Sequence, residues 1–133
     1  MKWMLDTDTC IATIKRSSGS ALKKLRGKSI GQVGLSAISL GELSFGAAKS
    51  LRRDEAFEAL SQFIFPLEVA AFDAAIASRY GDVRAALERR RTRIGPLDTL
   101  IAAHALELDL ILVTHNIHEL SRIEGLRFED WVD

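Results

Sequence analysis

Short apolar runs bounded by polar or turn-forming residues alternate along the chain with longer segments in which apolar residues recur at helical spacing. The short runs are typical of buried strands and the longer segments of helices. Strands are predicted at 3–5, 33–36, 65–69 and 110–113, with a weaker last candidate at 128–132. Helices are predicted at 9–16, 21–28, 38–51, 54–63, 72–91 and 97–108. Strands separated by helices predict a mainly parallel sheet of about four to five strands, covered on both faces.

Bulk composition adds limits to this picture. The length of 133 residues suits a single domain spanning 1–133, and the 47% of hydrophobic residues can form a core. Cys10 is alone, so no internal disulfide can form, which fits a reducing compartment. No apolar run has the length of a membrane span, and the N-terminus meets Asp6 too early for a signal peptide. We therefore expect a cytoplasmic protein without a membrane segment.

The net charge is zero, and this argues against a uniformly basic nucleic-acid binder. The charges are nevertheless distributed unevenly along the chain. Residues 1–53 carry 10 Lys and Arg against 3 Asp and Glu, whereas residues 54–133 carry 8 against 15. One part can face phosphates and the other a basic partner, but chance segregation explains the counts equally well. The end of helix 72–91 carries arginines that can grip RNA phosphates or form a solvated helix end: Arg89, Arg90, Arg91 and Arg93.

Several acidic and amide side chains lie where predicted strands end or helices begin. Asp6 directly follows the first strand, and Asp98 lies in the first turn of the helix that Gly95-Pro96 introduces. Asn116 and Glu119 follow the strand at 110–113. Ligands bind beyond the carboxyl ends of parallel strands, so we expect these side chains around one crevice. Structural alternatives remain open for each, namely helix capping, interaction with a helix dipole, or solvation.

Glu42 lies inside a predicted helix instead of at a strand end. Ile38 and Phe45 share its face, and Leu40 and Leu43 make the other side apolar too. A carboxylate on such a helix needs a partner or a ligand. Pairing with an arginine and participation in a binding site explain Glu42 equally well.

Carboxylates that lie close together repel one another unless a cation is present. Mg²⁺ or Mn²⁺ prefers oxygen ligands and keeps several waters, and it can activate water toward a phosphodiester. We therefore expect a divalent metal ion among Asp6, Asp98 and Glu42, with the polar side chains of Asn116 and Glu119 nearby. Attack by water on the phosphodiester predicts a product with a 5′-phosphate.

Four segments, in order and over nearly the whole chain, form a recognisable pattern. They are Met4-Leu5-Asp6-Thr7-Asp8, Ser36-Ala37-Ile38-Ser39-Leu40-Gly41-Glu42-Leu43-Ser44-Phe45-Gly46, Ile94-Gly95-Pro96-Leu97-Asp98 with Ile101-Ala102-Ala103-His104, and Leu112-Val113-Thr114-His115-Asn116-Ile117-His118-Glu119-Leu120, followed by Gly125-Leu126 and Glu129-Asp130-Trp131. With these segments the chain resembles PIN-domain ribonucleases, specifically the VapC-like toxins of type II toxin–antitoxin systems.

The resemblance implies a three-layer α/β/α sandwich and a metal-dependent endoribonuclease that acts as the toxin of a toxin–antitoxin pair. It implies Mg²⁺ or Mn²⁺ held mainly by Asp6 and Asp98, with Glu42 as a third acid and Glu119 as an acid common in this toxin group. It also implies a homodimer, a small antitoxin that blocks the site, and an RNA substrate, with transfer RNA as one candidate.

Three positions depart from the family pattern. Asp8 stands where Asn is usual, and it adds a second acid or caps the helix. His115 stands where Asn is common. Asn116 stands where Asp is frequent in the wider family, and a neutral side chain there argues against a fully ligated second metal ion.

Two other functions compete with a metal-dependent nuclease. Asp6-Thr7-Asp8 after a strand also resembles the first motif of aspartate-nucleophile phosphatases, but Cys10 stands where that motif has Thr and the later Lys and Asp-Asp set is missing. A nucleic-acid-binding or partner-binding module whose acids are structural is the second alternative. Metal dependence of RNA cleavage distinguishes the nuclease from such a module.

The histidines and tryptophans have ordinary interpretations. His104, His115 and His118 lack the spacing of a zinc site, so we expect them in the core or in solvent. Trp3 and Trp131 are expected in the core, with stacking on a base as the less favoured alternative.

Overall fold

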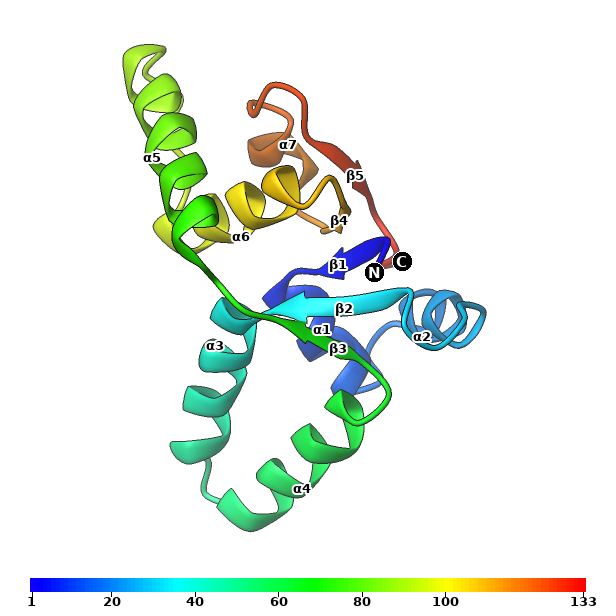
Figure 1. The fold of residues 1–133 in the computed structure, drawn as a ribbon. Coiled ribbons are helices and arrows are strands. Elements are labelled where there is room, and N and C mark those ends of the chain that lie inside the picture. Colours follow the sequence, from blue (N-terminus) through cyan, green and yellow to red (C-terminus); the bar gives the residue numbers. More distant parts are fainter.

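A five-stranded parallel sheet in the order β3-β2-β1-β4-β5 lies at the centre of the computed structural model, which describes residues 1–133 (Figure 1). The strands are β1 (Trp3–Leu5), β2 (Val33–Ser36), β3 (Glu68–Ala70), β4 (Ile111–Val113) and β5 (Arg127–Glu129). The predicted parallel sheet is therefore confirmed.

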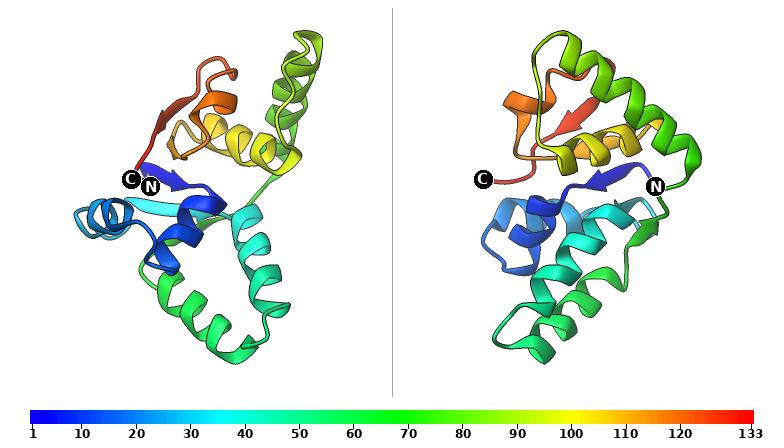
Figure 2. Two further views of the ribbon diagram at one scale, coloured as in Figure 1. Left: turned by 180° about the vertical axis from the view of Figure 1, so that it is seen from behind. Right: turned by 90° about the vertical axis from the view of Figure 1, so that its left-hand side faces the viewer.

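Helices cover both faces of this sheet. They are α1 (Thr7–Ile14), α2 (Gly19–Arg26), α3 (Ala37–Ala48), α4 (Arg53–Ile64), α5 (Ala74–Arg89), α6 (Pro96–Glu107) and α7 (Ile117–Leu120). Helices α1 to α4 lie on one side and α5 to α7 on the other, which gives the expected three-layer α/β/α sandwich (Figures 1 and 2). None of these helices combines the length and the apolar character that crossing a bilayer requires.

The central strand β1 contributes to two hydrophobic cores because successive strand residues face opposite sides of the sheet. Trp3 and Leu5 pack in the cluster that includes Leu60 of α4, whereas Met4 packs in the cluster that includes Ile101 of α6. Burial on both faces explains why the strand is a continuous apolar run and lacks alternation.

The position of β1 also places Asp6. β1 pairs with β2 on one side and β4 on the other, with Leu5 opposite Leu35 and Val113. Parallel strands end at the same edge, so Asp6 after β1 and Thr114 after β4 lie beside each other. The Asp6 amide donates to the Val113 carbonyl oxygen at 3.0 Å, which fixes this junction.

Helices α1, α2 and α3 begin earlier than the apolar pattern predicts, because side chains cap them. Asp6 accepts from the third amide of α1, Ser18 from the third amide of α2, and Ser36 from the second amide of α3. An oxygen that accepts from a free amide of the first turn lets a helix start before its apolar stripe does.

The prediction of a strand at 65–69 is wrong at its start, since β3 runs over Glu68–Ala70. The Phe65 amide donates to a carbonyl of α4 at 3.0 Å, and the Leu67 amide does so at 2.7 Å. These apolar residues therefore end the helix in a turn. A short apolar run alone does not distinguish a helix end from a strand.

The last strand also lies earlier than its prediction at 128–132, since β5 runs over Arg127–Glu129. The Val132 amide donates to the Asp130 carboxylate at 3.0 Å, a local bond outside the sheet. The apolar residues that follow β5 pack into the core without pairing: Trp131 is only 1% exposed.

Candidate active site

Asp6 is the most deeply buried carboxylate at the carboxyl edge of the sheet, with 4% of its surface exposed. Its Oδ1 accepts from the Thr9 amide at 2.9 Å and so caps α1. Burial raises the pKa of Asp6, hydrogen bonds from Thr114 and Thr9 act against this, and the charge of Asp8 raises it further. A carboxylate has two oxygens, so capping and metal binding are compatible at Asp6.

The Asn116 side chain joins two further acids of the predicted site. Its Nδ2 donates to Asp98 Oδ2 at 3.2 Å and to Glu119 Oε2 at 3.0 Å. Asp98 lies in the first turn of α6 and Glu119 in the first turn of α7. The alternatives in which the Asn116 side chain caps α7 and Glu119 is free in solvent are therefore wrong. The amide instead brings two carboxylates from different helices together.

Asp98 is half-buried beside these partners. Burial raises its pKa, the Asn116 hydrogen bond lowers it, and the charges of Asp8 and Glu119 raise it. Desolvation and two like charges thus oppose ionisation of Asp98, while a single amide supports it.

Glu42 is tied to the same crevice through Thr7 of α1. The Thr7 hydroxyl donates to Glu42 Oε1 at 2.6 Å, and its oxygen lies 3.1 Å from the hydroxyl oxygen of Ser39. The single proton of Thr7 is used on Glu42, so Ser39 donates to Thr7. The alternative in which Glu42 pairs with an arginine is wrong, since neither lysine nor arginine forms an ion pair with it.

Asp8 links the two sides of the crevice electrostatically. It lies exposed in the first turn of α1, and its charge raises the pKa values of both Asp6 and Asp98. The extra acid at this position therefore adds negative charge to the site and does not cap the helix, a role that belongs to Asp6.

These acids lack a protein counter-cation. None of the six ion pairs of the protein involves Asp6, Asp8, Glu42, Asp98 or Glu119. No three acidic, histidine or cysteine side chains converge on one point as the ligands of a closed metal cage do. Asp6, Asp98 and Glu42, expected as three ligands of one ion, are therefore not gathered into such a group. Mg²⁺ can bind through only one or two carboxylates and keep its remaining waters, so a metal site at part of this set stays a prediction.

Comparison with known proteins relates this crevice to a family. The PIN domain family matches residues 3–126 of the chain. The tRNA(fMet)-specific endonuclease VapC of Salmonella typhimurium is 40% identical over 131 residues, which are 98% of either chain. The chain belongs to the VapC group of the PIN-domain family.

Two further relatives cover the chain equally fully. Ribonuclease VapC2 of Rickettsia felis is 36% identical over 132 residues, or 98% of either chain. In a crystal structure of DNA-bound VapBC from Salmonella typhimurium, the matching chain superposes with a TM-score of 0.93 at 40% identity, again over 98% of both chains. The sequence-based resemblance and the predicted fold are thus confirmed.

The acidic crevice of this PIN domain opens into an apolar groove of about 1150 Å³ between α1, α3 and α4. Thr7, Asp8, Glu42 and Leu97 line the groove at its acidic end, and apolar side chains such as Ile11 continue it. Carboxylates and apolar surface are therefore continuous, so one partner can contact both.

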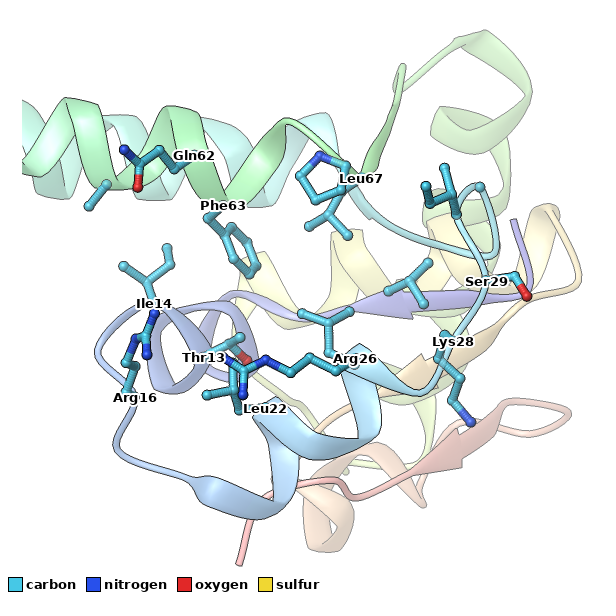
Figure 3. A pocket seen from close by; sticks show the side chains of 16 residues that line it. Thr13, Ile14, Arg16, Leu22, Arg26, Lys28, Ser29, Gln62, Phe63 and Leu67 are labelled. Atoms are coloured by element: carbon cyan, nitrogen blue, oxygen red, sulfur yellow. The ribbon is translucent and has the colours of Figure 1, made fainter.

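A separate cavity of about 610 Å³ lies between the end of α1, α2 and the end of α4 (Figure 3). Its rim carries Arg16, Arg26 and Lys28, and its lining contains no acidic side chain (Figure 3). The cavity therefore offers no carboxylate for a divalent cation and is distinct from the acidic crevice.

The histidines of the PIN domain lie where expected. His104 is fully buried, with Nδ1 2.8 Å from Ser36 Oγ, and burial lowers its pKa, so it is neutral in the core. His115 is exposed and lies 2.9 Å from Asp130, and His118 is exposed. No histidine joins a metal-binding group.

Trp3 and Trp131 are confirmed as core residues, since they are 8% and 1% exposed and their ring centroids lie 6.2 Å apart.

Three hydroxyls also belong to the site, and the pattern of acidic residues in the sequence does not reveal them. Thr7 and Ser39 position Glu42, and Thr114 supports Asp6 and accepts from the backbone N–H of Asn116 at 3.0 Å. Thr114 carries a sequence signal, because it directly follows a buried strand as Asp6 does. The Thr7–Glu42 contact spans 35 residues and has no comparable local signal.

Proposed function

We propose that the chain is a Mg²⁺-dependent endoribonuclease, with Mn²⁺ as an alternative ion, and the toxin of a type II toxin–antitoxin pair. The observation that carries the proposal is the acidic crevice at the carboxyl edge of the sheet, where no lysine or arginine balances the carboxylates. The VapC relatives named as an endonuclease and a ribonuclease support RNA as the substrate class.

Asp6 and Asp98 are the residues that would hold the ion, because burial desolvates both carboxylates and neither forms an ion pair with a lysine or arginine. A bound divalent cation supplies a Lewis acid that makes water a better nucleophile and offsets charge on the phosphodiester. It would also offset the negative charge of Asp8, which adds to desolvation in raising the pKa values of these two acids.

Glu42 is assigned a positioning role toward the attacking water. Thr7 fixes Oε1 of Glu42 at 2.6 Å, which leaves Oε2 to accept a hydrogen bond from that water. Asn116 holds Asp98 and Glu119 together in spite of their like charge.

Cleavage of RNA by the purified chain tests the proposal. We expect cleavage with Mg²⁺ or Mn²⁺, none with EDTA, and none by Asp6→Asn or Asp98→Asn. Asparagine caps helices as well as aspartate does, so Asp6→Asn leaves α1 intact. The exposed Asp82→Asn on α5 is the matched control and should cleave normally.

The products and the binding behaviour decide between mechanisms. Hydrolysis by water leaves a 5′-phosphate, whereas a 2′,3′-cyclic phosphate would show attack by the RNA's own 2′-hydroxyl and contradict the proposal. Binding of RNA without cleavage in Mg²⁺ would support the alternative of a nucleic-acid-binding module with structural acids.

A small antitoxin is the protein partner that we propose. Relatives from Salmonella typhimurium and Rickettsia felis were crystallised as VapBC with DNA. The continuous acidic crevice and apolar groove suit a partner segment that carries basic side chains beside apolar ones. The purified antitoxin should inhibit cleavage, and Glu42→Gln with Glu119→Gln should weaken its binding; unchanged affinity would contradict this docking.

We also propose a homodimer and transfer RNA as the first substrate to test. Phe45 and Leu97 line the same groove and are 66% and 44% exposed, so they offer apolar surface that a second copy can cover. Light scattering should give a dimer mass that falls for Phe45→Ser. The relative named as tRNA(fMet)-specific makes initiator transfer RNA the natural choice, with unstructured RNA as the comparison.

A further inference from the structure

Five arginines gather where the α5–α6 connection meets the segment after α7. This arginine cluster consists of Arg89, Arg90, Arg91, Arg93 and Arg122. The first four are exposed and Arg122 is partly exposed. The cluster lies on the α5 to α7 side of the sheet, away from the basic rim of the cavity beside α2 (Figure 1).

The cluster has no acidic partner, unlike its neighbours on the same helix. Arg79 pairs with Glu107 at 3.5 Å, and Arg84 pairs with Glu88 at 3.0 Å. No member of the cluster forms an ion pair. Its positive charge is therefore available to an anion from outside the chain.

Hydrogen bonds to backbone carbonyls hold two members of the cluster at this junction. Arg90 Nη2 donates to the Arg122 carbonyl oxygen at 2.5 Å, and Arg122 Nη1 donates to the Arg93 carbonyl oxygen at 2.9 Å. A carbonyl orients a guanidinium but does not neutralise it. Arg90 and Arg122 therefore keep their charge beside three neighbours of the same sign, and a polyanion relieves the repulsion within such a group.

The cluster and the acidic crevice share the same two chain segments. Arg93 precedes Asp98 by five residues, and Arg122 follows Glu119 by three. Five residues span at most about 18 Å even when fully extended. A short stretch of single-stranded RNA can therefore reach from the crevice to the cluster.

We propose that the arginine cluster binds backbone phosphates of the RNA strand that extends beyond the bond held in the acidic crevice. Guanidinium groups present planar donors that match phosphate oxygens in pairs. A protein with zero net charge has no general attraction for RNA, so a local basic surface must supply it. The inference rests on the proposed ribonuclease function.

Equilibrium binding tests the cluster independently of cleavage. All variants carry Asp98→Asn so that a labelled RNA oligonucleotide stays intact, and affinity is measured over a range of salt concentrations. The double variant Arg89→Gln/Arg93→Gln removes two charges whose side chains make no hydrogen bond within the protein. The matched control Arg79→Gln/Arg127→Gln removes two charges that lie outside the cluster and pair with Glu107 and Asp109.

We expect the cluster variant to bind RNA about tenfold or more weakly than the control, because charge-assisted hydrogen bonds to phosphates are lost. The slope of log affinity against log salt should fall by about 1.4, or about 0.7 for each phosphate contact with a single strand. In the cleavage-competent chain the same pair should raise KM and leave kcat unchanged.

Two results would overturn the inference. One is an affinity and salt slope equal to those of the control. The other is a loss of affinity for polyglutamate, in the cluster variant, as large as its loss of affinity for RNA. That result would show that the cluster binds anions in general and is not a site for a phosphate backbone. Neither result bears on metal-dependent cleavage, so the proposed function is tested separately.

Discussion

Replacing Asn116 by aspartate probes the contact that joins Asp98 to Glu119. The amide donates to these two carboxylates at 3.2 Å and 3.0 Å, and aspartate cannot donate to either when ionised. Asn116→Asp therefore removes two hydrogen bonds and adds a negative charge to a cluster without a counter-cation. We expect Asn116→Asp to be less stable than the wild type without metal and to be stabilised more than the wild type by Mg²⁺.

The magnitude follows from the partial burial of all three residues. A hydrogen bond to a charged group contributes about 1.5–3 kcal/mol when buried, and solvent screening reduces this for half-exposed groups. We expect the free energy of unfolding to fall by about 2 kcal/mol in EDTA, which for a chain of this length lowers Tm by roughly 8 °C. Mg²⁺ at a hundredfold excess over its Kd adds about 2.7 kcal/mol to a protein that binds it only when folded.

Thermal unfolding in EDTA and in a Mg²⁺ series measures both effects. Asn116→Ala separates the lost hydrogen bonds from the added charge. His118→Asp places the same added charge on the exposed face of α7. If Asn116→Asp unfolds in EDTA at the same temperature as His118→Asp, the amide does not hold the cluster together and this reasoning is refuted.

Three further changes have definite expectations. Burial raises the folded-state pKa of Asp98, so ionisation of Asp98 destabilises the folded protein. Asp98→Asn should therefore be more stable than the wild type at pH 7 in EDTA. Urea titrations should show that this difference in stability vanishes toward about pH 4, where the wild-type carboxyl group becomes protonated in both states. Thr7→Val should slow cleavage about tenfold by freeing Glu42, whereas Ser121→Ala, which removes an exposed hydroxyl that donates to the His118 carbonyl oxygen, should not. Burial lowers the pKa of His104, so wild-type stability should fall as pH drops below about 6.5, and His104→Leu should flatten that dependence between pH 7 and pH 5.

Strand positions and the polar residues at their ends can be predicted from local sequence, because a strand buried on both faces of the sheet is a continuous apolar run. Met4 and Leu5 must be apolar whichever face they meet, so β1 is visible as a run, and Asp6 is the first residue to leave the sheet. Asn116 is found in the same way because it closely follows β4, whereas Asp98 is marked by Gly95-Pro96 at the start of α6. Parallel pairing then brings Asp6 and Asn116 to one edge without any knowledge of side-chain contacts.

Contacts between residues that are distant in the sequence produce no local sequence pattern of this kind. Thr7 binds Glu42 across 35 residues, and the pattern around Glu42 suits an arginine partner equally well. The direction of the Asn116 amide depends on α6 and α7 together. Phe65 is as apolar as a strand residue, yet its amide completes a turn of α4, a choice that tertiary packing makes.

Sequencing of RNA 5′ ends in cells that express the chain tests whether the acidic crevice cleaves RNA. We expect new 5′-phosphate ends with the wild type and with Asp82→Asn, and none with Asp6→Asn at equal expression. The same new ends with Asp6→Asn, or no new ends with the wild type, would contradict an RNA-cleaving site built on this acidic crevice.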